Sequence, residues 1–270
     1  MRRESRESHR TEGSSMYMTV SGREIRRCGR AAILGLVVLG AAQAASAGPQ
    51  ASGVAYPQMA PGAEYLMPDR AAEISLARSA APAAISGSAT VLVLSSKGYE
   101  TAVSGTNGFT CVVERAWMSP FDSPQFWNPK LRGPVCYNPA ATRSILPITR
   151  YRTKLAQSGV SKDRMFDEIR GAITRKELPA LEPGAMSFMM SKDGYLGDDV
   201  GHWHSHLMFY IQGTDISSWG ANVPGSPVVV DDEHTRIPEQ QVTFLVPVSH
   251  WSDGSFAPAA GHAAGGGDKH

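Results

Sequence analysis

The sequence lacks an excess of charge of either sign, because 26 Lys and Arg residues are balanced by 25 Asp and Glu residues. The chain therefore has no excess of basic residues of the kind that attracts nucleic acid. Long apolar runs are also missing, which excludes a protein with several transmembrane helices. Apolar residues nevertheless make up 42% of the 270 residues and charged residues 19%. A fully disordered chain is therefore excluded, and a folded core is expected.

The short motifs of several enzyme classes are absent as well. The sequence contains no G-x-S-x-G nucleophile motif, no S-x-x-K motif, no G-x-x-x-x-G-K-[ST] phosphate loop and no H-E-x-x-H metal motif. A Ser-His-acid triad stays compatible with the sequence, because the fold rather than neighbouring positions brings its members together.

Cysteine is scarce, with three residues in the chain, of which Cys111 and Cys136 lie beyond the predicted leader described below. An even pair in an oxidising compartment predicts a disulfide, worth about 3.5 kcal/mol in the chain-entropy model. Two separate buried thiols are the alternative. A disulfide removes both thiols as candidate nucleophiles.

Residues 1–47 have the organisation of a secretory signal peptide with a polar lead. The basic stretch REIRRCGR precedes the apolar run AAILGLVVLGAA, and Ala45-Ser46-Ala47 supplies the small residues of a cleavage site. About a dozen apolar residues are too few to cross a bilayer comfortably as a helix, and an uncleaved anchor is the alternative. We expect export to the periplasm or the extracellular space, with no membrane span after cleavage. The remaining 18 basic and 21 acidic residues give a net charge of −3, so no nucleic-acid partner is expected.

The rest of the chain predicts one α+β domain at residues 68–255. A flexible lead-in is expected at 48–67 and a disordered tail at 256–270, because both segments are rich in small residues and lack periodicity. Within the domain we expect a mainly antiparallel β-sheet packed against one or two α-helices, with one long loop rich in proline and aromatic residues.

Local patterns place the elements of this domain. Asp69 and Ser161 are positioned to cap two helices. The Asn107-Gly108 pair lies between two strand-like runs and predicts a hairpin, so the first three strands should form an antiparallel meander. The expected helices are 70–80 and 161–178, and the expected strands are 89–96, 99–105, 109–117, 184–191, 202–211 and 241–249.

The long loop is expected at residues 117–139, where five prolines oppose a long helix or a central strand. We expect its large rings to pack on the sheet as core, the alternative being a flat platform that stacks on a ligand. These rings belong to Trp117, Phe121, Phe126, Trp127 and Tyr137.

The segment GHWHSHLMFYIQG carries three histidines at alternate positions. On a β-strand, His202, His204 and His206 project from one face, together with Met208 and Tyr210. Neutral imidazole is a common ligand of zinc and other transition metals. Because Cα atoms two positions apart on a strand are separated by about 6.6 Å, two neighbouring histidines can reach one ion. All three can do so only if the strand bends.

A complete metal site needs a further ligand from elsewhere in the chain. The candidates are His250, Asp253, His234, Asp198, Asp199, Glu100 and Glu114. Glu114 and Asp199 are also candidates for a general base beside a metal-bound water. The alternative is a solvated histidine face that binds no metal.

The H-x-H motif resembles the strand motif of cupins and the histidine pair of secreted cell-wall metallopeptidases. The glutamate that cupins carry a few residues later is absent after His206. The metallopeptidase pattern needs an earlier histidine, and none lies between the predicted leader and His202. No catalytic residue is therefore assigned from either resemblance.

Two functional hypotheses follow. The first is an exported metal-dependent hydrolase that uses zinc or another transition metal and acts on a small molecule or a cell-envelope component. The second is a non-catalytic envelope protein that binds a ligand or a metal, or has a purely structural role.

Overall fold

The computed structural model describes residues 56–198, 201–202, 204–213, 216–230, 237–239 and 241–258. The predicted signal peptide lies outside this part of the chain, as does most of the predicted tail. The helices are η1 (Gly62–Tyr65), α1 (Arg70–Arg78), α2 (Ala83–Ser86), η2 (Ala116–Met118), α3 (Pro139–Ser144), α4 (Leu146–Gln157), α5 (Lys162–Thr174) and η3 (Ile216–Trp219). The strands are β1 (Thr90–Ser95), β2 (Gly98–Val103), β3 (Thr110–Glu114), β4 (Gly133–Tyr137), β5 (Met186–Met189), β6 (Tyr195–Gly197), β7 (Gly201–His202), β8 (His206–Gln212) and β9 (Gln241–Pro247).

Seven strands form one sheet in the order β2-β1-β3-β4-β5-β8-β9. Every neighbouring pair is antiparallel except β1 and β3, which run parallel. The strands β6 and β7 pair with each other in a separate two-stranded sheet. The expected α+β class with a mainly antiparallel sheet is confirmed. Among the described residues, no helix is long and apolar enough to cross a membrane.

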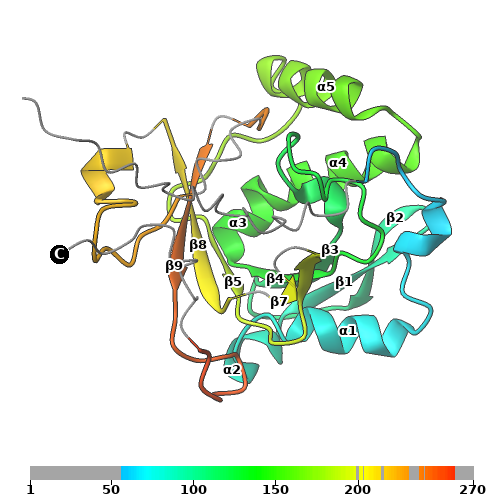
Figure 1. The fold of residues 1–270 in the computed structure, drawn as a ribbon. Coiled ribbons are helices and arrows are strands. Elements are labelled where there is room, and N and C mark those ends of the chain that lie inside the picture. Colours follow the sequence, from blue (N-terminus) through cyan, green and yellow to red (C-terminus); the bar gives the residue numbers. More distant parts are fainter. Residues whose placement is uncertain are drawn as a thin grey trace, which may run out of the picture. The chain divides into compact units, whose positions relative to one another are not determined.

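Alternation along the strands gives the sheet two apolar faces. One face packs against α1 and α2, and the other packs against α3, α4 and α5, so that helices lie on both sides of the sheet (Figure 1). The core under α1 includes Ala77, Val91, Cys111, Val113 and Cys136. The core under α4 includes Leu92, Val112, Tyr137, Ile169 and Tyr210. The first core is made of small residues, which brings α1 close to the sheet.

The predicted meander is wrong at Asn107-Gly108, because β3 does not pair with β2. Instead β3 joins the other edge of β1 in a parallel arrangement. The connection passes tightly over the start of β1: a Cβ on Gly105 would lie 2.1 Å from the Thr90 nitrogen, so only glycine fits there. The Asn107 side chain then donates to the Ile85 carbonyl and accepts from the Phe109 N–H. These contacts direct the chain across β1 rather than back along β2.

The helices agree only in part with the sequence pattern. The Asp69 side chain accepts from Ala71 N–H and caps α1 as predicted. α5 starts after Ser161 as expected and ends at Thr174, earlier than predicted. The adjoining helices α3 and α4 were not predicted. Prolines lie in the first turn of each, where the missing N–H costs no intrahelical bond.

The prediction of one long loop at 117–139 is wrong at residues 133–137, which form a strand despite the prolines. β4 lies in the middle of the sheet and contains Pro134. Because β5 pairs with β4 only at Cys136 and Tyr137, Pro134 meets no hydrogen-bond partner on that side. The expected core role of the aromatic rings is confirmed: none of the five is more than 4% exposed.

Residues 56–67, part of the expected lead-in, contact this loop. Tyr65 is buried, and its hydroxyl donates to the Trp127 carbonyl at 2.8 Å. Its ring packs against Trp117, with centroids 5.0 Å apart. The Tyr56 N–H donates to the Pro124 carbonyl at 3.0 Å. The segment therefore covers one side of the aromatic core.

The predicted disulfide between Cys111 and Cys136 is confirmed. The two residues are directly opposite each other on β3 and β4. Both are fully buried in the core under α1, so the bond joins two central strands inside the fold.

Candidate functional site

The segment predicted as one histidine strand is divided between two sheets. His202 belongs to β7, which pairs with β6, whereas the long strand β8 begins at His206. Between them, the Ser205 hydroxyl donates to the His250 carbonyl at 2.6 Å, and the Ser205 carbonyl accepts from Val248 N–H. These contacts hold residue 205 against the segment after β9. The prediction of a continuous strand at 202–211 is therefore wrong.

The described histidines differ in environment. His204 is exposed, whereas His206 is only 4% exposed. The His206 Nδ1 lies 2.6 Å from the His204 carbonyl oxygen and can donate its proton to it. Burial lowers the pKa of His206 to about 4, so the ring is neutral at neutral pH. The side chain of His202 lies outside the described part, so metal binding by the three histidines stays a prediction.

The described residues contain no group of three His, Cys, Asp or Glu side chains that could hold a metal ion. The predicted further ligands lie apart and have other partners. His250 contacts Ser249, Asp253 pairs with Lys192, Asp198 accepts from Tyr56 and Tyr195, and Glu100 accepts from Ser95. His234 and Asp199 lie outside the described residues.

Glu114 has the most distinctive surroundings of these candidates. It is the last residue of β3, partly buried, and on the sheet face covered by α4. The Tyr137 hydroxyl donates to Glu114 Oε1, and the Thr149 hydroxyl lies 3.4 Å from the same oxygen. Burial raises the pKa of Glu114, while the Tyr137 hydrogen bond and the charge of Arg152 act against the rise. Its titration is thereby moved toward neutral pH.

Further hydroxyl groups lie on the same sheet face. Tyr210 and Ser187 are hydrogen-bonded at 2.9 Å between β8 and β5. Burial, with the nearby Glu114 charge, raises the pKa values of Tyr137 and Tyr210, so both phenols keep their protons. We call the set of Glu114, Tyr137, Thr149, Ser187 and Tyr210 the Glu114 cluster.

Arg152 of α4 is a charged residue that influences this cluster. It forms two hydrogen bonds to the Glu239 carboxylate, at 3.0 and 2.8 Å, and both side chains are buried. Its remaining nitrogen donates to the carbonyls of Trp117 and Ser119, each at 3.1 Å. The hydrogen bonds of the Arg152 guanidinium thus go to Glu239 and to the two carbonyls. Its effect on Glu114 comes from its positive charge, which lowers the Glu114 pKa.

The Glu114 carboxyl has one oxygen left for a ligand. Both of its hydrogen bonds reach Oε1, and no residue in the described part of the chain donates to Oε2. A carboxyl with a raised pKa and an unused oxygen can accept a proton from water or donate one to a substrate. Perturbed carboxyls of this kind are common at functional sites.

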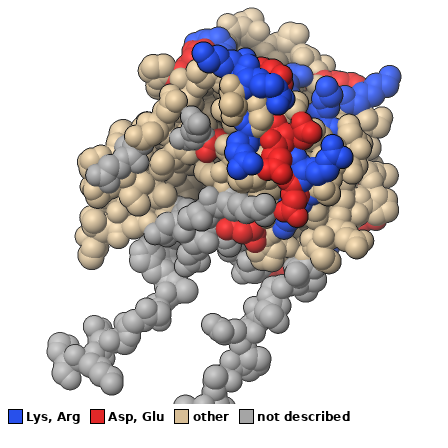
Figure 2. Space-filling model, turned by 90° about the horizontal axis from the view of Figure 1, so that it is seen from above, with Lys and Arg blue, Asp and Glu red and all other residues tan. Residues whose placement is uncertain are grey.

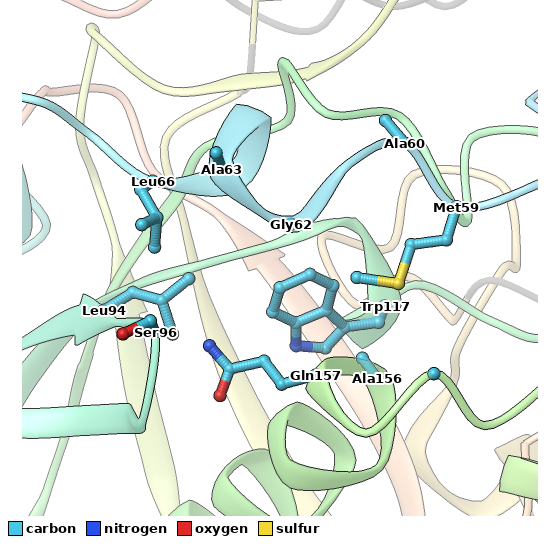
Figure 3. Close-up of a pocket in the computed structure, with 11 residues that line it drawn as sticks. Met59, Ala60, Gly62, Ala63, Leu66, Leu94, Ser96, Trp117, Ala156 and Gln157 are labelled. Atoms are coloured by element: carbon cyan, nitrogen blue, oxygen red, sulfur yellow. The ribbon is translucent and has the colours of Figure 1, made fainter.

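An open groove is lined by Trp117 but by no member of the Glu114 cluster. It has a volume of about 440 Å³ and runs between η1, the end of β1 and the end of α4. Figure 3 shows the Trp117 ring facing the space between Met59, Leu94 and Gln157. The Trp117 Nε1 donates to the Thr153 hydroxyl on α4, one turn from Thr149. The same indole therefore lines the groove and is hydrogen-bonded to the helix that carries Thr149.

The sequence indicates Glu114 as a candidate but does not indicate its partners. The alternation of side chains along β3 is the sequence feature that points to Glu114. It places this charged residue on the same sheet face as the apolar Val112. Tyr137 appeared only as a core aromatic and Tyr210 only as a neighbour of the histidines. Thr149 lies on a helix that was not predicted.

Comparison with known proteins gives no match: no protein-family model fits the chain, and neither a curated protein nor a solved structure is significantly similar to it.

Proposed function

We propose that the protein is an exported hydrolase in which Glu114 is the acid–base group. The observation that carries the proposal is the Glu114 carboxyl itself, which is partly exposed, has a raised pKa and leaves Oε2 unbonded by the described residues. The substrate class is an ester of a small molecule or of a cell-envelope component.

In this reaction Glu114 first acts as a base. The ionised carboxylate accepts a proton from a water molecule as the water oxygen bonds to the ester carbonyl carbon. The carbon–oxygen bond to the leaving group then breaks, and the leaving oxygen takes the proton from the Glu114 carboxyl. The products are an acid and an alcohol, and the carboxylate is regenerated. Tyr137, which stays protonated, holds Oε1 and so orients Oε2 toward the water.

The proposal is tested with the purified protein on p-nitrophenyl esters, with p-nitrophenyl phosphate and a peptide as comparison substrates. We expect ester hydrolysis that Glu114→Gln lowers by at least about 100-fold, since this is the usual contribution of a general base. Asp167→Asn is the control, because Asp167 is an exposed carboxyl on α5 with no proposed role. Each assay is run with and without zinc and a chelator, which also tests the predicted metal dependence.

Tyr137→Phe distinguishes a working carboxyl from a structural one. Loss of the Tyr137 hydrogen bond removes an influence that lowers the Glu114 pKa. The acidic limb of the pH profile of kcat/KM should therefore move to higher pH. Full activity of Glu114→Gln would overturn the proposal, and lack of turnover with every substrate class would favour the non-catalytic envelope protein.

A further inference from the structure

A second open cavity lies away from Trp117, where α3 and α4 meet the ends of β8 and β9. It has a volume of about 460 Å³, within the range of small-molecule sites. Its walls are mainly apolar and include Ile148, Ile173, Leu178 and Leu181. Its polar groups come from Lys176 after α5 and from a pair of glutamines on the sheet.

Lys176 has an unfavourable backbone conformation for its residue type. Its φ angle is +60°, in the left-handed region that favours glycine. It follows the C-cap of α5 in a Schellman turn, in which the N–H groups of Lys176 and Glu177 donate to the carbonyls of Ile173 and Ala172. Glycine is the usual residue at this position. A lysine there carries a backbone strain that glycine would not have.

In the described part of the chain, the Lys176 ammonium forms no ion pair with a carboxylate. The two glutamates closest in sequence are held by arginines, since Glu177 pairs with Arg175 at 2.6 Å and Glu182 pairs with Arg143 at 2.7 Å. Figure 2, viewed from the side of α5, shows basic and acidic side chains next to each other on this face. The exposed Lys176 ammonium is thus available to an anion at the mouth of an apolar cavity.

The two glutamines add hydrogen-bonding groups at the other side of the cavity. Gln212 and Gln241 are direct partners at the end of the β8–β9 ladder, so their side chains project from the same face of the sheet. Both line the cavity.

We propose that this cavity binds a small monocarboxylate with an apolar chain. The carboxylate pairs with Lys176 at the mouth, and the chain lies against Ile148, Ile173 and Leu181. The site is independent of Glu114 and of the proposed hydrolysis. Its chemistry follows from a cation that forms no ion pair with the described residues and lies beside apolar walls, so an anion is preferred over a cation of equal chain length.

The test uses octanoate and octylamine as probes in isothermal titration calorimetry with the whole protein. The two probes share a chain length, so the difference between them reports the charge at the mouth. We expect octanoate to bind more tightly than octylamine. Lys176→Met should weaken octanoate binding by about fivefold, the upper range for an exposed ion pair, and Lys176→Glu should reverse the preference. Lys97→Met, at an exposed lysine in the β1–β2 turn, is the control and should change nothing.

Lys176→Gly gives the sharper result, because its two effects have opposite signs. Relief of the left-handed strain should raise the melting temperature by about 2 °C, while octanoate binding weakens as in Lys176→Met. A merely structural lysine predicts a lower melting temperature and unchanged binding. Equal affinity of the parent protein and Lys176→Glu for octanoate, or the absence of octanoate binding, would overturn the proposal.

Discussion

Arg115, next after the end of β3, lies with its guanidinium 2.8 Å from the Glu73 carboxylate on α1, and neither side chain is more than 2% exposed. The Arg115 Nε also donates to the Tyr65 carbonyl at 2.7 Å, and the same Glu73 oxygen accepts from Leu94 N–H at 3.1 Å. This pair therefore joins the sheet, α1 and the segment before α1.

Removal of one member should destabilise the protein strongly. Glu73→Ala leaves a buried guanidinium without its counter-ion and should lower the free energy of unfolding by about 3–5 kcal/mol. The double variant Glu73→Leu with Arg115→Met should cost less than the single one, because no charge stays buried. Urea unfolding monitored by circular dichroism measures both. A loss below about 1 kcal/mol for Glu73→Ala would contradict a tight buried pair.

The disulfide should contribute stability without being accessible. Replacing both Cys111 and Cys136 by serine should lower the free energy of unfolding by about 3.5 kcal/mol, the chain-entropy value for a sequence separation of 25. Because both sulfurs are buried, reduction of the folded protein should be slow and should accelerate in urea. Titration of the thiols released at successive times after addition of a reductant measures the rate. Rapid reduction under native conditions would show that α1 leaves the sheet easily.

His206 should make the fold sensitive to acid. Its pKa is lowered from 6.5 to about 4 by burial, so the unfolded chain binds this proton more readily than the folded one. The stabilising contribution is complete above pH 6.5 and is lost as the pH falls toward 4, a change of about 3 kcal/mol. His206→Gln should make the free energy of unfolding depend less on pH between about 6.5 and 4. The exposed His204→Gln is the control and should keep the parent slope.

Glu114 should change the pH dependence of folding stability in the opposite direction from His206, and the Glu114→Gln variant tests this. A raised carboxyl pKa favours the folded state at low pH, and this contribution is lost as the pH rises from 4.5 through the raised value. Glu114→Gln should therefore be relatively more stable than the parent protein as the pH increases. Parallel stability profiles for the two proteins would contradict the raised pKa.

The predicted transition metal has a direct test in the dialysed, zinc-reloaded protein. The His206 side chain is buried with its Nδ1 bonded to the His204 carbonyl, whereas His204 is exposed. We therefore expect His204→Ala to lose zinc while His206→Ala mainly loses stability. His250→Ala serves as a comparison, because His250 was a predicted further ligand. Absence of zinc in the parent protein after reloading would contradict the metal prediction.

The alternation of residues in the sequence predicted correctly which side chains of a strand share a face of the sheet. The alternation of His206, Met208 and Tyr210 is confirmed by their register against β5 and the segment before it. This alternation did not predict which strands are neighbours, because side chains alternate with a period of two residues whether the neighbouring strand is parallel or antiparallel. The Asn107-Gly108 signal was overridden by the close passage of Gly105 over β1. Likewise, Pro134 is tolerated in a central strand only because β5 is too short to pair with it.

The amino-acid sequence by itself determined the α+β class, the pairing of Cys111 with Cys136 and the sides of the strands, because these depend on local patterns and on two cysteines with no competitor beyond the predicted leader. The tertiary structure alone decided the Glu114 cluster. Its members come from β3, β4, β5, β8 and α4. Only the strand order and a helix placed by packing bring the hydroxyl groups of Tyr137 and Thr149 to the Glu114 carboxyl. Desolvation at that point, a property of the assembled core, is what raises the Glu114 pKa.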